Sequence, residues 1–178
     1  MSKIYKVLFS LLIVTLLVSA IFFFSEQSGT DSHSVSTQVC EKIADVWAKT
    51  FWAENSPYSK ELLARMLDGP VRKLAHLLIY TALGCGTCIA AHILSSGKVR
   101  FYHILLCILA VMLVASFDEY NQFYSGGRGA SLSDVWLDTV GGYVGIYLVF
   151  MAKDFVRHIK RGITREKEIR LQKSDSNS

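Results

Sequence analysis

Several charged and polar residues of this sequence lie inside long apolar segments, where their burial is unfavourable. Arg72, His76 and Tyr80 are spaced four residues apart, which places the three side chains on one face of a helix. Asp134 and Asp138 are also four residues apart. An ionisable group at the centre of a bilayer costs about 2.5–3.5 kcal/mol on insertion scales, so groups of this kind have a function or a partner.

These residue types fit two kinds of chemistry. Lysine and arginine bind anionic groups, and the planar guanidinium of arginine forms two hydrogen bonds to a phosphate or carboxylate. A carboxylate can instead act as a general base with an imidazole as the acid, or hold Mg²⁺ or Mn²⁺ through its oxygens. Neither the run Asp118-Glu119 followed by Gln122 nor the pair Asp134 and Asp138 is a diagnostic metal motif. We therefore assign no metal ligand and no cofactor from the sequence. The catalytic candidates are His76, Asp118, Glu119, Asp134 and Asp138.

The structural alternative is that the same groups form interhelical salt bridges that only hold a bundle together. Four carboxylates would then face three cations and one imidazole. That is more charge than adhesion needs, because interhelical hydrogen bonds average about 0.6 kcal/mol in measured cycles. The count therefore favours a functional site. The three cations are Arg72, Lys73 and Arg128.

The elements that carry these residues are four apolar segments. The chain has 178 residues, 51% hydrophobic and 19% charged, and the apolar residues are concentrated in blocks rather than scattered. About 20 helical residues cross a hydrocarbon core of about 30 Å. The pattern excludes a soluble enzyme, a β-barrel and a disordered chain, and it predicts an all-α integral membrane protein with four transmembrane helices. The spans are expected at about 4–24, 71–94, 101–122 and 132–152.

Lysine and arginine residues predict the orientation. They accumulate in the short loop 95–100 and after residue 152, so both termini are expected in the cytoplasm. The segment 25–70 is then an external loop between helices 1 and 2. Val35, Val39, Ile43 and Val46 recur at helical spacing there, which predicts an amphipathic helix, and a second short helix is expected to stop at Gly69-Pro70. A simple connecting loop is the alternative.

The orientation brings the polar groups of three helices to the outer end of the bundle. At a rise of 1.5 Å per residue, His76, Asp118 and Asp138 each lie about 6–9 Å inward from the outer end of their own helix. Groups at matching depth can satisfy one another only by facing a common interior. We therefore expect one outward-facing polar pocket. Glycines that permit close helix packing are Gly84, Gly86, Gly141, Gly142 and Gly145.

Four sequence blocks, in order along the chain, resemble the VanZ-like family. They are Phe24 to Gly29, Arg72 to His76 with Tyr80, Asp118 to Phe123, and Gly127-Arg128 followed by Asp134 and Asp138. The resemblance runs from about Ile4 to Met151. It implies a small multi-pass protein of the bacterial cell membrane, with a VanZ-like four-helix domain at 1–152 and a basic cytoplasmic tail at 153–178. The family's namesake is associated with low-level resistance to teicoplanin and related lipoglycopeptides.

With this resemblance, two hypotheses remain for the pocket. It binds an anionic lipid, a lipid-linked wall precursor or the antibiotic, or it is the site of an enzyme acting on an envelope lipid or its head group. The expected partners are thus a membrane lipid or wall precursor, or the lipoglycopeptide, and no nucleic acid; the sequence leaves the oligomeric state open. The predicted ligand-binding residues are Ser25, Gln27, Ser28, Arg72, Lys73, His76, Tyr80, Asp118, Glu119, Gln122, Arg128, Asp134 and Asp138.

Overall fold

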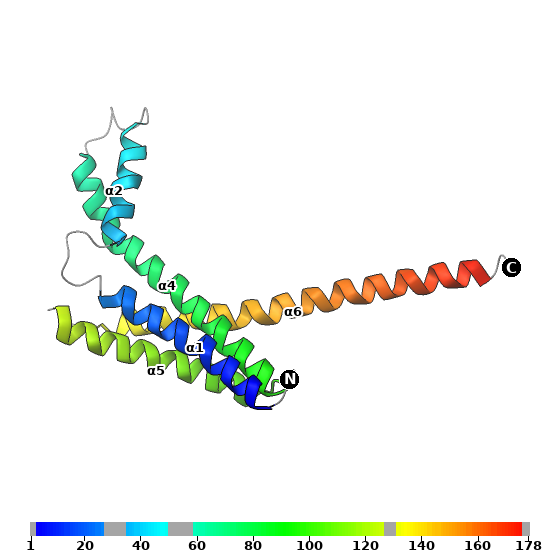
Figure 1. Cartoon of the computed structure of the whole chain (residues 1–178). Coiled ribbons are helices and arrows are strands. Elements are labelled where there is room, and N and C mark those ends of the chain that lie inside the picture. Colours follow the sequence, from blue (N-terminus) through cyan, green and yellow to red (C-terminus); the bar gives the residue numbers. More distant parts are fainter. Residues whose placement is uncertain (1–2, 27–34, 50–58, 127–130, 176–178) are drawn as a thin grey trace. The chain divides into compact units, whose positions relative to one another are not determined.

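The computed structural model describes residues 3–26, 35–49, 59–126 and 131–175, and every regular element in them is a helix (Figure 1). The chain divides into two compact units, Met1–Ile146 and Tyr147–Ser178. The second unit contains the remainder of the last helix. The helices are α1 (Lys3–Glu26), α2 (Val35–Ala48), α4 (Lys60–Leu94), α5 (Phe101–Gly126) and α6 (Leu132–Asp175).

Four of these helices, α1, α4, α5 and α6, are long and apolar enough to cross a membrane. They contain the four predicted spans. Many of their large apolar side chains are exposed in the isolated chain, such as Leu8 at 57%, Leu78 at 60% and Leu113 at 68%. Side chains of this kind are suited to contact with lipid, which is as apolar as they are.

The helices of the first unit alternate in direction. The Lys6 ammonium near the start of α1 donates to the hydroxyl of Ser96, just after the end of α4, at 3.1 Å. Ser25 at the end of α1 lies beside Gln122 near the end of α5, with 2.6 Å between Ser25 Oγ and Gln122 Nε2. Thus α1 and α5 run in one direction and α4 in the other, and α1 packs against both (Figure 1).

Close packing of α4 against the first half of α6 depends on glycine. A Cβ on Gly84 would collide with the backbone of Gly142, and one on Gly145 would collide with the carbonyl of Thr81. A Cβ on Gly141 would lie 2.7 Å from the carbonyl oxygen of Leu77. The glycines therefore bring the two backbones together, as predicted, and they set the distance between the polar faces of the two helices. Beside this crossing lies a core of Ile21, Tyr80, Leu83, Val111 and Ala115.

The predicted helix end at Gly69-Pro70 is wrong, because α4 continues through both residues. Ser59 caps the start of this helix, and its hydroxyl accepts a hydrogen bond from the Leu62 amide at 3.2 Å. An internal proline loses one backbone hydrogen bond and clashes with the preceding turn, at about 3 kcal/mol. Gly69 reduces the steric conflict because it has no Cβ to meet the proline ring. Packing on both sides of Pro70, against α2 and against α1, opposes the remaining cost.

The α2 helix packs against α4, and Figure 1 shows it beside the first part of that helix. Its buried residues are Cys40 and Ala44, at 1% and 0% exposure. Lys60 of α4 forms an ion pair with Asp45 of α2. The apolar residues that predicted this helix, such as Ile43 and Val46, remain exposed in the chain. Cys40 and Ala44 are small, so the two helices can approach each other closely, and these two residues are buried at the contact with α4.

Candidate functional site

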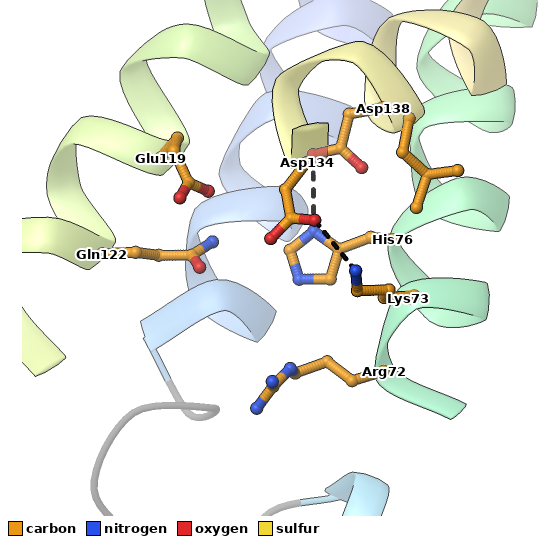
Figure 2. A pocket seen from close by; sticks show the side chains of 8 residues that line it. Arg72, Lys73, His76, Glu119, Gln122, Asp134 and Asp138 are labelled. Carbon is orange, nitrogen blue, oxygen red and sulfur yellow. Dashed lines mark ion pairs between the residues drawn. The ribbon is translucent and has the colours of Figure 1, made fainter. Parts of the chain in front are cut away.

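Three helices of the first unit, α4, α5 and α6, enclose a polar cavity of about 60 Å³ (Figure 2). A water occupies about 30 Å³ in the liquid, so the cavity admits a small ion or a very few waters. Every lining residue except Leu137 was predicted from the sequence. The lining consists of Arg72, Lys73, His76, Glu119, Gln122, Asp134, Leu137 and Asp138.

The imidazole of His76 lies at the centre of the site and faces two carboxylates. His76 Nδ1 is 3.6 Å from Asp138 Oδ2 on α6 and 3.9 Å from Asp118 Oδ2 on α5. Both aspartates are almost fully buried, at 1% exposure for Asp118 and 4% for Asp138. The three helices thus bring these side chains together at one depth, and the expected common interior exists. When the imidazole is protonated, it forms an ion pair with both acids.

A hydrogen-bond network of residues from α1, α4 and α5 fixes the position of the Asp118 carboxylate. The buried Tyr80 hydroxyl donates to Asp118 Oδ2 at 3.3 Å, and Gln122 Nε2 donates to the same oxygen at 3.2 Å. Gln122 also donates to the Ser25 hydroxyl at 2.6 Å, which connects the end of α1 to the site. Asp118 Oδ1 is buried and has no hydrogen-bond partner among the described residues.

Two cations from α4 stand at the rim of the cavity. The Lys73 ammonium lies 3.3 Å from Asp134 Oδ1, and both side chains are substantially exposed. The Arg72 guanidinium lines the cavity and forms no ion pair with any side chain that the structure describes. In Figure 2 it extends across the space below the imidazole. Among the described residues, the rim therefore has one cation that is paired with a carboxylate and one that is not.

Glu119 lines the cavity and also binds the backbone at the start of α6, which its position in the sequence did not predict. Its Oε1 accepts a hydrogen bond from the backbone amide of Ser131 at 2.6 Å. The first amides of a helix have no partner within the helix, and a side-chain acceptor at this point fixes where the helix begins. Glu119 thus positions the start of α6, and with it Asp134 and Asp138. No local motif announces such a bond, because donor and acceptor belong to different elements.

Three predicted ligand-binding residues, Gln27, Ser28 and Arg128, lie outside the described residues. The pocket residue that the sequence did not single out is Leu137, which forms an apolar wall between Asp134 and Asp138. It gives no signal because any transmembrane helix contains residues of its kind.

The arrangement combines an anion-attracting rim with a floor of hydrogen-bond acceptors. His76, Asp118 and Asp138 each offer a donor atom to a metal, and these atoms lie within 4.8 Å of one another. The cavity-lining His76 and Asp138 can also accept hydrogen bonds from hydroxyl or amine groups, or exchange a proton with a bound molecule.

Comparison with known proteins gives one assignment. The family model described as VanZ/LLP1 matches residues 9–153, most of the chain, and confirms the resemblance seen in the four sequence blocks. The chain matches no curated protein and no solved structure at a significant level.

Proposed function

This chain belongs to the VanZ-like family, and from that premise we propose that it is a bacterial cell-membrane protein contributing to glycopeptide and lipoglycopeptide resistance, teicoplanin included. In this proposal, the cavity between α4, α5 and α6 opens to the outside. It binds the anionic, lipid-linked headgroup of a membrane lipid or wall precursor, or the antibiotic itself.

The proposed orientation places both termini in the cytoplasm. Lys6 near the start of α1 lies next to Ser96, in the loop that also carries Lys98 and Arg100. Basic residues gather in cytoplasmic loops, so this end of the bundle is the inner one. The cavity is at the opposite end, where α1 and α5 finish. The contact between α2 and α4 is then external as well, and the exposed apolar residues of α2 can rest on the membrane surface.

The observation that carries the proposal is the placement of Arg72 at the mouth of a cavity with buried acceptors. The Arg72 guanidinium has no carboxylate partner among the described residues, and a guanidinium can make two hydrogen bonds to a phosphate or carboxylate. Below it, the cavity-lining carboxylate of Asp138 can accept from a hydroxyl or amine group of the same headgroup. The cavity is too small for a saccharide, so the charged end of the ligand binds at the rim.

The lipid part of the ligand would lie against the outer surfaces of the helices. Tyr120, Phe123 and Trp136 flank the site in sequence and are 56%, 49% and 69% exposed. Aromatic residues of this type favour the membrane interface, where the ring is apolar and the edge is wet. They suit an occupant whose headgroup and chain meet at this level.

The test measures binding to purified protein in nanodiscs. The probes are phosphatidylglycerol, an undecaprenyl-linked wall precursor and teicoplanin, each assayed separately. We expect one probe to bind saturably, and Arg72→Ala to weaken it at least tenfold. Arg65→Ala is the matched control, because Arg65 is on the same helix, exposed and outside the cavity. Equal binding by the Arg72→Ala and wild-type proteins would overturn the proposal.

The buried pair of His76 and Asp138 favours a second candidate, an enzyme acting on an envelope lipid. A carboxylate next to an imidazole can orient it and stabilise its protonated form during proton transfer. Incubation with labelled lipid precursors, with and without chelator, distinguishes this candidate from simple binding. New product that disappears in Asp138→Asn would favour catalysis. Unchanged precursor after long incubation would favour binding.

A further inference from the structure

Three side chains at or beside the cavity, one partly buried and two almost fully buried, have the composition of a metal site. His76 comes from α4, Asp118 from α5 and Asp138 from α6, so the donors converge from three separate helices. Two ligands held about 2.1 Å from one ion are separated by roughly 3–4 Å at ordinary coordination angles. The measured separations are 3.6 Å from His76 Nδ1 to Asp138 Oδ2 and 3.9 Å to Asp118 Oδ2. A small inward movement would complete the geometry.

The charge of the cluster also calls for a cation. Two carboxylates that are 96% or more buried lie in a part of the protein surrounded by apolar helices. Among the described residues, no lysine or arginine forms an ion pair with either acid, and Lys73 pairs with Asp134 at the rim. A single protonated imidazole compensates only one of the two negative charges. Buried charges of this kind are paired or coordinate metals.

An independent observation comes from the unsatisfied oxygen of Asp118. Tyr80 and Gln122 both donate to Oδ2, yet Oδ1 is buried without a hydrogen-bond partner among the described residues. Buried polar atoms rarely lack a partner, and a missing ion is one of the recognised reasons. The two donors resemble the outer hydrogen bonds that orient ligating carboxylates in metal sites.

We propose that His76, Asp118 and Asp138 bind one divalent first-row transition ion, of the class of Mn²⁺, Fe²⁺ and Zn²⁺. One imidazole and two carboxylates suit these ions, whereas Mg²⁺ prefers oxygen ligands alone. The cavity touches His76 and Asp138, so a water or an oxygen of a bound molecule can occupy an open coordination position. The inference goes beyond headgroup binding and does not depend on it.

The experiment uses full-length protein in nanodiscs, stripped with chelator and then incubated with Mn²⁺, Zn²⁺ or Mg²⁺. After desalting, elemental analysis is expected to give one Mn²⁺ or Zn²⁺ per chain and little Mg²⁺. Asp118→Asn, Asp138→Asn and His76→Gln should each lower the affinity at least tenfold. Asp154→Asn is the control, since Asp154 is an exposed carboxylate on the same helix as Asp138 and lies outside the cavity, and it should keep the metal.

A second measurement covers the case in which these variants do not fold. Wild-type protein loaded with Co²⁺ should show the visible absorption of an ion with nitrogen and oxygen ligands, and chelator should abolish it. A wild-type protein that takes up neither metal nor colour would overturn the proposal and leave a buried imidazolium–carboxylate cluster. Equal metal content in wild-type and Asp138→Asn proteins would overturn it too. Loss of headgroup binding in Arg72→Ala with full metal content would support both proposals and show that metal binding does not depend on headgroup binding.

Discussion

His76 on α4 and Asp138 on α6 face each other across 3.6 Å, between two helices that are each apolar enough to cross a membrane. The contact joins two helices that are far apart in the sequence, and Asp118 on α5 extends it to a third. The site is therefore a property of the assembled bundle. Each helix alone would carry a polar group into lipid with nothing to satisfy it.

The pairing predicts strong coupling between His76 and Asp138. Asp138→Asn and His76→Gln should each lower resistance several-fold without abolishing it, while membrane abundance changes little. The double variant should be no worse than the more damaging single variant, because residues that act as a unit give non-additive effects. Teicoplanin sensitivity and immunoblots of membrane fractions, in a host without its own copy, provide the measurement. Independent, additive losses would mean that the two residues act in separate places.

The glycine contact between α4 and α6 predicts a steric effect on stability. Gly84→Ala places a Cβ against the backbone of Gly142, which cannot rotate away as a side chain could. Overpacking of this kind costs about 1–3 kcal/mol, and it should lower the unfolding temperature and the binding affinity together. Gly162→Ala is the control because nothing lies within 4 Å of its added methyl group. A thermal unfolding series in detergent should separate the two variants clearly.

The hydrogen bond from Ser131 to Glu119 predicts that the acceptor matters more than the charge at this position. Glu119→Gln keeps a carbonyl oxygen and should preserve stability and resistance. Glu119→Ala removes the acceptor and should destabilise the protein by about 1 kcal/mol, as loss of a helix cap does. Thermal stability and teicoplanin sensitivity measured together check the expectation. Loss of resistance in Glu119→Gln at unchanged stability would instead assign the carboxylate a chemical role.

The burial of Cys40 between α2 and α4 predicts that its thiol reacts slowly with a maleimide. Burial raises the pKa of the Cys40 thiol above its ordinary value, and the carboxylate of Asp68 adds to the effect. The thiolate is the reactive form, so labelling by a membrane-impermeant maleimide should be slow at pH 7 and rise with pH toward that raised pKa. Denaturation should make labelling fast.

An exposed position on the same helix provides the control for this experiment and tests the orientation. In a Cys40→Ala background, Val46→Cys places a thiol at a position where the side chain is 67% exposed. It should be labelled rapidly on intact cells. Labelling that needs permeabilised cells would place α2 in the cytoplasm and reverse the proposed orientation.

Much of the bundle could be predicted from the sequence, because two strong physical constraints act on it. Apolar blocks of spanning length define α1, α4, α5 and α6, and the unfavourable burial of charge forces His76, Asp118 and Asp138 to face one another. Helical spacing then gives the face on which each side chain lies. These constraints are local to each helix, so they are visible without the fold.

Other features depend on contacts that no local pattern contains. The continuation of α4 through Pro70 follows from packing on both sides of the proline, and the bond between Glu119 and Ser131 depends on how two elements meet. The face of α2 was also not evident, because Cys40 and Ala44 make the contact while the more apolar Val46 stays outside. Hydrophobicity alone ranks these residues in the opposite order.

The uninterrupted course of α4 has a mechanical consequence. The α4 helix extends without a break from its contact with α2 to Arg72, Lys73 and His76 in the pocket. Within it, Pro70 removes one backbone hydrogen bond. Because Arg72 and Lys73 directly follow Pro70 and Val71 on this helix, and His76 lies one turn further, a displacement of α2 would be passed through α4 to the three side chains that face the carboxylates of the neighbouring helices.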